Sequence, residues 1–343
     1  MATIKQIAQQ AGVAASTVSR VLSHDITLSV SKEKRQRIEQ IAKQLGYLSP
    51  TQRKQQQNTD VGVVARSHFQ TPSMTDLHLL VVHFLTPTQE LNDPYFTSIR
   101  IGIENRCHHF NIGLRSSFTN NLPSNMRFME QAQGVICVGH FSLEHIQLIR
   151  SINRNLIFID SNPLPKLADA VTFDRKSAAR EIVRYIIESG AKRPAFIGNQ
   201  EDRLYVFRQM TQEAGIYCEP LCKISPNFCI DSGYQAMAEI LDSPLQPDVV
   251  FAATDIIAIG VYRAIQERGI DIPGKIQVVG MNDIPTSQHL NPSLTTMRLY
   301  PAEMGEAAVD LFMELVEGRS YKKNVQLGFD MIWRESFERV TYR

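Results

Sequence analysis

The sequence lacks long hydrophobic runs and has few cysteines, and both shortages restrict the class of protein. No apolar run approaches the roughly 18 residues that a membrane-spanning helix requires. The N-terminal residues MATIKQIAQQAG are polar and contain no apolar stretch of the signal-peptide type. We therefore expect a cytoplasmic protein that has no membrane partner.

Metal sites, cofactor loops and catalytic groups are also lacking. Cys218, Cys222 and Cys229 cluster loosely, but no Cys-x-x-Cys pair or nearby histidine completes a zinc site. Five irregularly spaced cysteines without a secretion signal are typical of reduced thiols. No G-x-G-x-x-G or G-K-[ST] loop follows the first apolar segments, and no Ser/His/Asp set or carboxylate pair stands out. We predict no metal, no cofactor and no enzymatic activity.

Charge is distributed unevenly along the chain, although the net charge is only +1. Residues 1–57 hold nine Lys and Arg against three Asp and Glu, whereas the remainder holds 27 basic and 32 acidic residues. A basic head on a mildly acidic body indicates that the head contacts a polyanion. With 343 residues, of which 43% are hydrophobic, the chain is long enough for a small domain and a large one with a sizeable core.

The basic head has the pattern of three short helices. The first starts at Thr3, in a capping-box pattern, and Gly12 breaks it. The second covers residues 15–22, and the third is capped by Ser31 and ends at Gly46. Apolar residues recur at helical spacing and are predicted to face inward: Ile4, Ile7, Ala8, Ala11, Val18, Val21, Leu22, Ile38, Ile41, Ala42 and Leu45. The glycine turn indicates a helix-turn-helix, whose second helix enters a major groove.

TIKQIAQQAGVAASTVSRVL, followed later by IAKQLGY, resembles the DNA-binding head of the LacI/GalR repressor family. A generic three-helix bundle, the alternative, needs neither the T-V-S-R run nor the basic excess. The resemblance implies that Ala15, Ser16 and Arg20 read bases, and that Thr17 and Ser19 lie near phosphates. Arg20 has the chemistry for this, since an arginine can bind guanine O6 and N7 bidentately. The full set of candidate DNA-binding residues is Thr3, Ile4, Ala15, Ser16, Thr17, Ser19, Arg20, Ser23, Gln52 and Arg53.

The head departs from the family pattern at two places, and the segment after it departs further. Ala14 replaces the usual serine N-cap, which costs the second helix about 1 kcal/mol. The loop at residues 23–30 is longer than in the family's lactose repressor. The family's hinge helix should follow Tyr47, but glutamines 55–57 stand where a leucine wedge is expected. Residues 51–76 are therefore either a hinge that DNA induces or a flexible polar linker with an insertion.

From residue 77 onward, short apolar segments alternate with amphipathic helices. The predicted strands are HLLVVHFL, GVICVG, LIFID, PAFIG, DVVFAA and IQVVGMND. Such βαβ alternation predicts parallel sheets covered on both faces. More than ten elements in about 265 residues are too many for one compact sheet, so we predict two Rossmann-like lobes.

The family resemblance extends over this body, through NDPYFTSIRIGIE, ATDIIAIGVYRAIQERGIDIPGKIQVVGMNDI, PSLTTMR and WRES. It implies lobes of the periplasmic-binding-protein type, with a ligand in the cleft between them. The predicted fold class is therefore a small all-α helix-turn-helix head joined to an α/β body. The predicted boundaries are residues 1–50 for the head, 51–76 for the hinge, 77–160 and 298–321 for the first lobe, and 161–297 and 322–343 for the second lobe.

Effector-binding residues follow from the same resemblance: Asp93, Tyr95, Phe96, Asp160, Ser161, Arg203, Thr254, Asp255 and Asn282. Arg203 matches a sugar-gripping arginine, whose planar donors suit adjacent hydroxyls or a carboxylate. Tyr95 and Phe96 are expected on a loop, where their rings can stack on a pyranose. Two alternatives remain open: Asp255 caps the helix that follows it, or Arg203 is a surface residue. Thr254 replaces the family's asparagine and Val206 its glycine.

ELNDPYF, NDIPT and the lengthened loop are most similar, within the family, to a repressor of a β-galactosidase operon. The resemblance implies a regulator that binds a pseudo-palindromic operator as a homodimer and is released by a β-galactoside or related sugar. The chain reaches Arg343 without a leucine-heptad tail, from which we expect a dimer and not a tetramer. The alternative is an activator, or a regulator of another carbon pathway that needs a co-repressor. A transport-type sugar-binding protein would share the lobes but not residues 1–50.

Overall fold

The computed structural model describes residues 4–22, 30–44, 77–225 and 227–338. The chain forms two compact units, residues 1–70 and 71–343. We call them the helical unit and the body. Each is described by itself.

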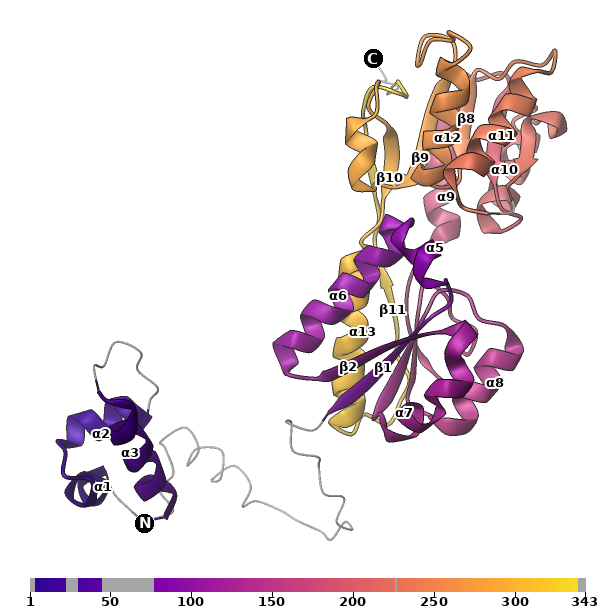
Figure 1. Ribbon diagram of the computed structural model, residues 1–343. Coiled ribbons are helices and arrows are strands. Elements are labelled where there is room, and N and C mark those ends of the chain that lie inside the picture. The colour runs from indigo at the N-terminus through magenta and orange to yellow at the C-terminus, as the bar shows by residue number, and fades with distance from the viewer. Residues whose placement is uncertain (1–3, 23–29, 45–76, 226, 339–343) are drawn as a thin grey trace. The chain divides into compact units, whose positions relative to one another are not determined.

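The described part of the helical unit consists of α1 (Ile4–Ala11), α2 (Ala15–Leu22) and α3 (Lys32–Gln44) (Figure 1). Gly12 joins the first two helices with a φ of 67°, a left-handed conformation that glycine adopts without strain. The predicted apolar stripe forms the core, with Ile7, Val18, Val21 and Ile38 fully buried. The helix-turn-helix expected from the sequence is confirmed, except that Leu45 lies outside the described residues.

The body contains two six-stranded sheets. The first has the order β11-β5-β4-β3-β1-β2, and all its pairings are parallel. Its strands are β1 (His78–His83), β2 (Gly113–Phe118), β3 (Gly134–Val138), β4 (Leu156–Ile159), β5 (Asp169–Phe173) and β11 (Asn324–Leu327). Its helices are α5 (Pro87–Leu91), α6 (Pro94–Phe110), α7 (Met126–Gln131), α8 (Leu143–Ile152), α13 (Pro301–Val316) and the 3₁₀ helix Thr119–Asn125.

The second sheet repeats this arrangement, with the order β12-β10-β9-β8-β6-β7. It is parallel except where β12 pairs with β10 in the antiparallel sense. Its strands are β6 (Pro194–Gly198), β7 (Cys222–Ile224), β8 (Val249–Ala252), β9 (Gln277–Asn282), β10 (Thr295–Arg298) and β12 (Asp330–Ile332). Its helices are α9 (Arg175–Glu188), α10 (Asp202–Glu213), α11 (Ile230–Leu241), α12 (Asp255–Gln266) and the 3₁₀ helices Glu219–Leu221 and Pro285–His289.

Each sheet is the centre of a lobe, and helices cover both of its faces. The alternation in β1 shows why: Leu79 and Val81 belong to one buried cluster, whereas Leu80 and Val82 belong to another. A strand buried on both faces is a continuous apolar run, which is why HLLVVHFL predicts this strand correctly. The two predicted Rossmann-like lobes are therefore confirmed, and Figure 1 shows them as separate sheets.

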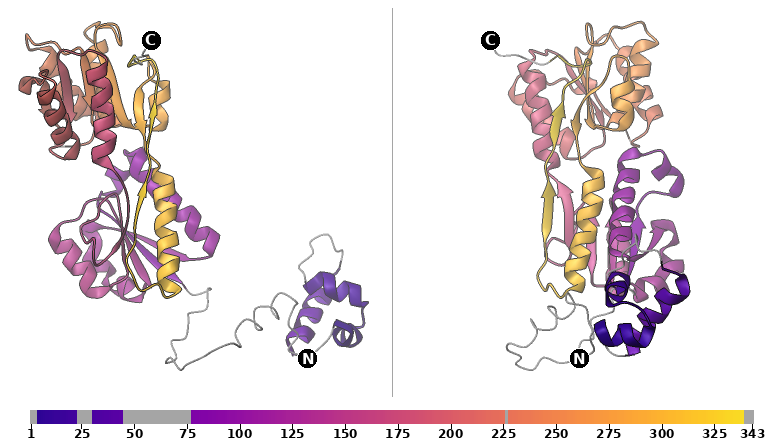
Figure 2. Two further views of the ribbon diagram at one scale, coloured as in Figure 1. Left: turned by 180° about the vertical axis from the view of Figure 1, so that it is seen from behind. Right: turned by 90° about the vertical axis from the view of Figure 1, so that its left-hand side faces the viewer.

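Two of the predicted lobe boundaries are wrong. β5 and β11 pair with each other in the first sheet, so the chain leaves the first lobe after Phe173 and, later, after Leu327. The sequence had placed these crossings at residues 160–161 and 321–322. The strands involved are short and follow loops, so the local pattern does not reveal which sheet each one joins. Figure 2 shows the connecting segments running side by side between the lobes.

Two helices of the first lobe, α6 and α13, pack unusually closely. A Cβ atom on Gly102 would lie 2.0 Å from the Ala302 carbonyl oxygen, and one on Gly305 would lie 2.3 Å from that of Ile99. Both positions therefore require glycine if the helices are to keep this separation. No helix in the described parts of the chain is long and apolar enough to cross a membrane.

Candidate functional site

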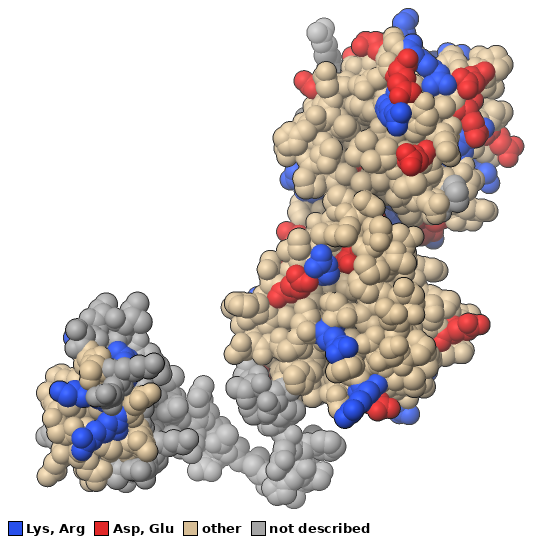
Figure 3. Space-filling model, viewed as in Figure 1, with Lys and Arg blue, Asp and Glu red and all other residues tan. Residues whose placement is uncertain are grey.

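The outer face of α2 presents the side chains that the sequence assigned to contacts with bases and phosphates. Ala15, Ser16, Ser19 and Arg20 are exposed, and Thr17 is half-buried. Helical spacing produces this arrangement, because the inward positions between them are taken by the buried core valines of α2. Figure 3 shows Lys and Arg side chains gathered on the visible face of the helical unit, whereas both signs of charge are interspersed on the body.

The remaining predicted DNA contacts are not all on this face. Ile4 is half-buried and packs against the core of the helical unit. Thr3, Ser23, Gln52 and Arg53 lie outside the described residues, and the predicted hinge at residues 51–76 does as well. α2 begins directly after Ala14, whose carbonyl accepts from the Val18 amide at 3.2 Å. Alanine at this position has no side-chain oxygen with which to cap the helix.

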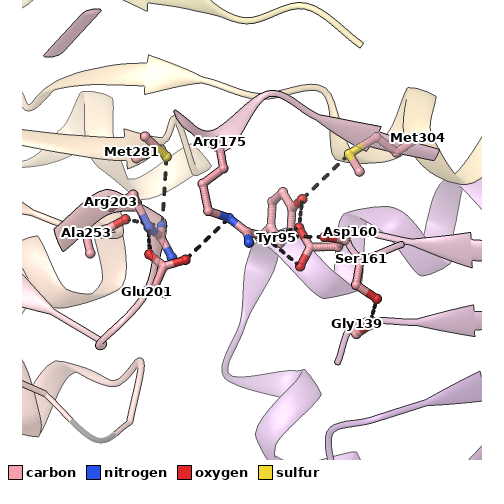
Figure 4. A network of polar contacts seen from close by, with 10 residues as sticks. All are labelled: Tyr95, Gly139, Asp160, Ser161, Arg175, Glu201, Arg203, Ala253, Met281 and Met304. Atoms are coloured by element: carbon pink, nitrogen blue, oxygen red, sulfur yellow. Dashed lines mark hydrogen bonds and ion pairs between the residues drawn. The ribbon is translucent and has the colours of Figure 1, made fainter. Parts of the chain in front are cut away.

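In the body, the carboxyl ends of the parallel strands from both sheets meet in one network of polar contacts (Figure 4). Asp160 follows β4 and Arg175 follows β5, whereas Glu201 follows β6. Arg175 Nη2 donates to both carboxylate oxygens of Asp160 at 3.3 Å, and its Nε lies 3.5 Å from Glu201 Oε2. Ligands of open α/β sheets bind outside the carboxyl ends of the strands. This network is therefore our candidate effector site.

Arg203 forms the second-lobe end of the network. It lies in the first turn of α10, where its Nε donates to Glu201 and its Nη1 donates to the Ala253 carbonyl at 2.5 Å. The guanidinium also lies 5.3 Å from the centre of the Phe228 ring. Only 8% of the side chain is exposed. The alternative that Arg203 is a surface residue is therefore wrong.

Of the three predicted residues near β1, Tyr95 and Phe96 lie in the first turn of α6 and not on a loop, which changes their roles. Asp93 is the N-cap of α6 and accepts from the amides of Tyr95 and Phe96. Burial raises the pKa of Asp93 to about 6. Tyr95 is buried, and its hydroxyl donates to Asp160 at 2.9 Å. The ring of Phe96 packs edge-on against Phe84 and Tyr95. The predicted stacking of Tyr95 on a sugar ring is therefore wrong, since its faces are covered.

Thr254 and Asp255 also differ from the prediction. The N-cap of α12 is Thr254, whose hydroxyl accepts from the Ile257 amide, so Asp255 is not the cap. The carboxylate of Asp255 is buried and turns into the lobe. It accepts hydrogen bonds from the Ile284 amide and from two hydroxyls, those of Ser287 and Thr296. Asp255 therefore links the segment after β9 to β10 inside the lobe, and it does not present its carboxylate to a ligand.

The other predicted residues sit at strand ends. Ser161 donates to the Gly139 carbonyl at 2.6 Å within the first lobe. It follows β4 in the first sheet, so neither Ser161 nor Asp160 marks the crossing between lobes, as the sequence had suggested. Asn282 ends β9 with a φ of 123°. No donor among the described residues contacts its buried side-chain oxygen, and the same holds for Asn199, which follows β6.

Sequence reasoning missed Arg175, Glu201, Asn199 and Phe228. Each one lies just after a strand or before a helix. A polar residue after a short apolar segment is the signal that could have found the first three. That signal is weak, because it applies to every strand of both sheets. What distinguishes Arg175 is its pairing with Asp160 across the lobes, which no local pattern contains.

Comparison with known proteins identifies the family. Residues 3–49 match the family described as "Bacterial regulatory proteins, lacI family", and residues 183–337 match the periplasmic binding protein-like domain. The HTH-type transcriptional regulator GalR of Streptococcus thermophilus is 33% identical over 353 aligned positions, which cover 98% of this chain and 99% of the relative. The chain belongs to the LacI family of bacterial transcription regulators. It is therefore a DNA-binding regulator and not an enzyme.

Other LacI-family members support this assignment. The HTH-type transcriptional repressor MelR of Bacillus subtilis is 31% identical, with 98% of this chain and 97% of the relative covered. A lactose operon repressor of Rhizobium radiobacter is 51% identical over 106 residues, which are 31% of this chain and 94% of that sequence.

Solved structures share the LacI-family fold. A transcriptional regulator CelR–cellobiose complex has a TM-score of 0.68 at 21% identity, with 98% of this chain and 100% of that chain covered. The lac repressor dimer bound to operator and the anti-inducer ONPF has a TM-score of 0.69 at 21% identity, with 98% of both chains covered.

Proposed function

We propose that this LacI-family regulator is a repressor of an operon for the use of a β-galactoside-type sugar, and that the sugar releases it from its operator. The network that joins Asp160, Arg175, Glu201 and Arg203 at the strand ends of both lobes carries the proposal. The sugar class is supported by the relative named lactose operon repressor, because lactose is a β-galactoside.

The effector is held by side chains at the strand ends of the second lobe, at the network that links this lobe to Asp160 of the first. Arg203 donates to sugar hydroxyls, while the side-chain oxygens of Asn199 and Asn282 accept from them. Both oxygens are buried and have no donor among the described residues, and an acceptor left in that state is costly unless a ligand or water supplies the donor. A sugar carries many hydroxyl donors, so it suits these oxygens.

The DNA-binding surface is the outer face of α2, led by Arg20. A helix-turn-helix reads one half-site, so a pseudo-palindromic operator takes two copies of the chain related by two-fold symmetry. The lac repressor, whose fold this chain shares, is described as a dimer bound to operator. We accordingly propose a homodimer.

The sugar acts by changing the contacts between the lobes. Arg175 pairs with Asp160 of the first lobe and with Glu201 of the second, so a ligand bound among these groups alters the balance between two lobe arrangements. A ligand shifts such a balance only by its difference in affinity for the two states. Couplings of this kind are typically about 1–3 kcal/mol.

A mobility-shift experiment on DNA upstream of the protein's own gene tests the proposal. Full-length protein should retain this DNA and release it when lactose or galactose is added, with cellobiose as a comparison sugar. Tighter DNA binding in the presence of a sugar would make the sugar a co-repressor and contradict the proposed sign. If none of the sugars changes DNA affinity or binds in calorimetry, the sugar effector is wrong.

A further inference from the structure

The two arginines of the network are already occupied by the protein's own groups. In Arg203, Nε donates to Glu201 and Nη1 donates to the Ala253 carbonyl and contacts the Met281 sulfur. A guanidinium has two edges that can grip a carboxylate with a pair of N–H groups, Nε with Nη2 and Nη1 with Nη2. One nitrogen of each edge is therefore in use. Only Nη2 remains available to a ligand, and it can donate to a single acceptor because the nitrogen next to it on each edge is already in use.

Arg175 is occupied in a similar way. Its Nη2 donates to both oxygens of the Asp160 carboxylate, and its Nε faces Glu201 Oε2 at 3.5 Å. The edge formed by Nε and Nη2 thus lies against two carboxylates. The neighbouring cation Lys176 is also paired, with Asp202 at 3.5 Å. Each of these three cations has a carboxylate partner, so the site offers no unpaired cation among them to a negatively charged ligand.

We propose that Glu201, together with Asp160, makes the effector site selective for uncharged sugars and excludes sugar acids and sugar phosphates. This inference rests on the proposed sugar effector. An anionic ligand needs two adjacent N–H groups for bidentate pairing, and to obtain them it must displace Glu201 or Asp160. It would then lie beside the displaced carboxylate, and juxtaposed like charges disfavour a complex strongly. A hydroxyl needs only one donor and displaces neither.

The geometry also distinguishes Glu201 from an ordinary ion-pair partner. Its two oxygens divide between two arginines, Oε1 with Arg203 and Oε2 with Arg175. Glu201 therefore blocks both guanidiniums at once, from a position at the end of β6. Specificity by such a repulsive group is a common way to reject a competing ligand. Glu201 is thus a specificity residue that acts against the wrong sugar.

Matched sugar pairs test this inference on the full-length protein. Galactose is compared with galacturonate and with galactose 6-phosphate, and glucose with glucuronate; within each pair only the substituent at C6 differs. The variant is Glu201→Gln, whose amide oxygen can still accept from Arg203 but which has no negative charge. Glu188→Gln is the control, because Glu188 is also paired with an arginine and its side chain is also 22% exposed. Affinities are measured by titration calorimetry, and folding by thermal melting.

We expect the wild type and Glu188→Gln to bind each neutral sugar at least about tenfold more tightly than its anionic partner. Glu201→Gln should narrow this ratio severalfold, chiefly because it binds the anionic member better. Asp160→Asn is the second variant if Glu201→Gln melts early, and the same narrowing is expected. Equal or tighter binding of the anionic sugars by the wild type overturns the inference and leaves the sugar-responsive function standing. An unchanged ratio in folded Glu201→Gln also overturns it. Lactose is titrated alongside, and binding of neither lactose nor any sugar of the matched pairs refutes the proposed function and the inference together.

Discussion

The phenolic hydroxyl of Tyr95 donates a hydrogen bond to Asp160 Oδ1 at 2.9 Å. Tyr95 belongs to the first turn of α6, whereas Asp160 follows β4, so the bond joins two separate elements of the first lobe. The tyrosine ring is buried and its hydroxyl also contacts the Met304 sulfur at 3.6 Å. Tyr95 therefore holds the Asp160 carboxylate where Arg175 can donate to it, and in this way it positions the first-lobe end of the network.

Replacing Tyr95 with phenylalanine tests this positioning role. Tyr95→Phe keeps the ring and its packing but removes the donor, so stability should fall by about 1 kcal/mol. Sugar affinity should fall severalfold because Asp160 is no longer fixed, while operator affinity without sugar stays unchanged. Tyr205→Phe is the control, since Tyr205 is an exposed tyrosine on α10. Wild-type sugar affinity in Tyr95→Phe would show that the hydroxyl does not position the site.

A second prediction concerns the pH dependence that Asp255 confers. Burial raises its pKa from 3.8 to about 6, against the opposing effect of its three hydrogen bonds. Because the folded state holds this proton more tightly, the stabilisation is complete below about pH 4 and is lost as the pH rises through 6. The shift corresponds to about 3 kcal/mol. Asp255→Asn cannot ionise and therefore lacks this loss.

The free energy of unfolding of Asp255→Asn, relative to that of the wild type, should thus rise by about 3 kcal/mol between pH 4 and pH 7. Urea unfolding followed by the fluorescence of Trp333, the single tryptophan, measures this difference. Asp231→Asn, at an exposed aspartate of α11, is the matched control. A difference between variant and wild type that is constant with pH would contradict a buried carboxyl with a raised pKa at this position.

The sequence predicted six strands, β1, β3, β4, β6, β8 and β9, and missed the internal strands β5 and β10 as well as the edge strands. For the edge strands there is a physical reason. β8 and residues 79–82 of β1 are buried and form continuous apolar runs. The edge strands β2 and β7 have the sequences GLRSSF and CKI, because one side of each strand lacks a neighbour and most of its side chains are exposed or half-buried. Hydrophobic pattern reports burial, so it does not detect strands that are little buried.

The sequence placed the site at the right strand ends, but it assigned Tyr95 and Asp255 to ligand contact, whereas both side chains are buried within their lobes. The register of α6 and α12 decides which way Tyr95 and Asp255 point. α6 starts at Pro94 after its cap Asp93, and α12 starts at Asp255 after its cap Thr254. A shift of one residue turns a helical side chain by about 100°, and sequence does not fix a helix start that finely. The pairing of Arg175 with Asp160 depends on how the two lobes meet, which no local pattern contains.

For DNA recognition, we expect Arg20→Ala to weaken specific operator binding by about 1–3 kcal/mol, with most of the loss in base discrimination. Arg20 lies exposed on the outer face of α2. Arg37→Ala is the control, since Arg37 is an exposed arginine of the same unit on α3. Its loss should reduce binding to operator and scrambled DNA alike, if it reduces binding at all. The ratio of the two affinities decides the matter, and a wild-type ratio in Arg20→Ala would refute base reading by this residue.

The assembly state provides a fourth prediction. Two copies of α2 are needed to read the two half-sites of a pseudo-palindromic operator. Light scattering of the purified protein should therefore give about twice the chain mass of 38.8 kDa. The measurement is made without DNA, so that the operator does not impose the pairing. A stable monomer or a stable tetramer would contradict the proposed homodimer.

The last prediction concerns Arg203, for which replacement by lysine is a cleaner test than replacement by alanine. Alanine would leave the buried Ala253 carbonyl without its donor, which costs about 1–3 kcal/mol, and would remove one of the two arginine partners of Glu201. Arg203→Lys keeps the positive charge and one donor nitrogen. It removes the planar guanidinium and its open nitrogen, which the sugar is proposed to use.

Sugar affinity of Arg203→Lys should fall by about ten- to over a hundredfold, as expected for the loss of a charge-assisted hydrogen bond of about 1.5–3 kcal/mol. Operator binding without sugar should be unchanged, because Arg203 belongs to the body and the helical unit contains α2. The variant should therefore hold its operator when sugar is added. Arg208→Lys, five residues along α10, is the matched control and should respond as the wild type does. Calorimetry with lactose, paired with a thermal melt, measures the effect. A well-folded Arg203→Lys with wild-type affinity would show that this arginine does not bind the effector.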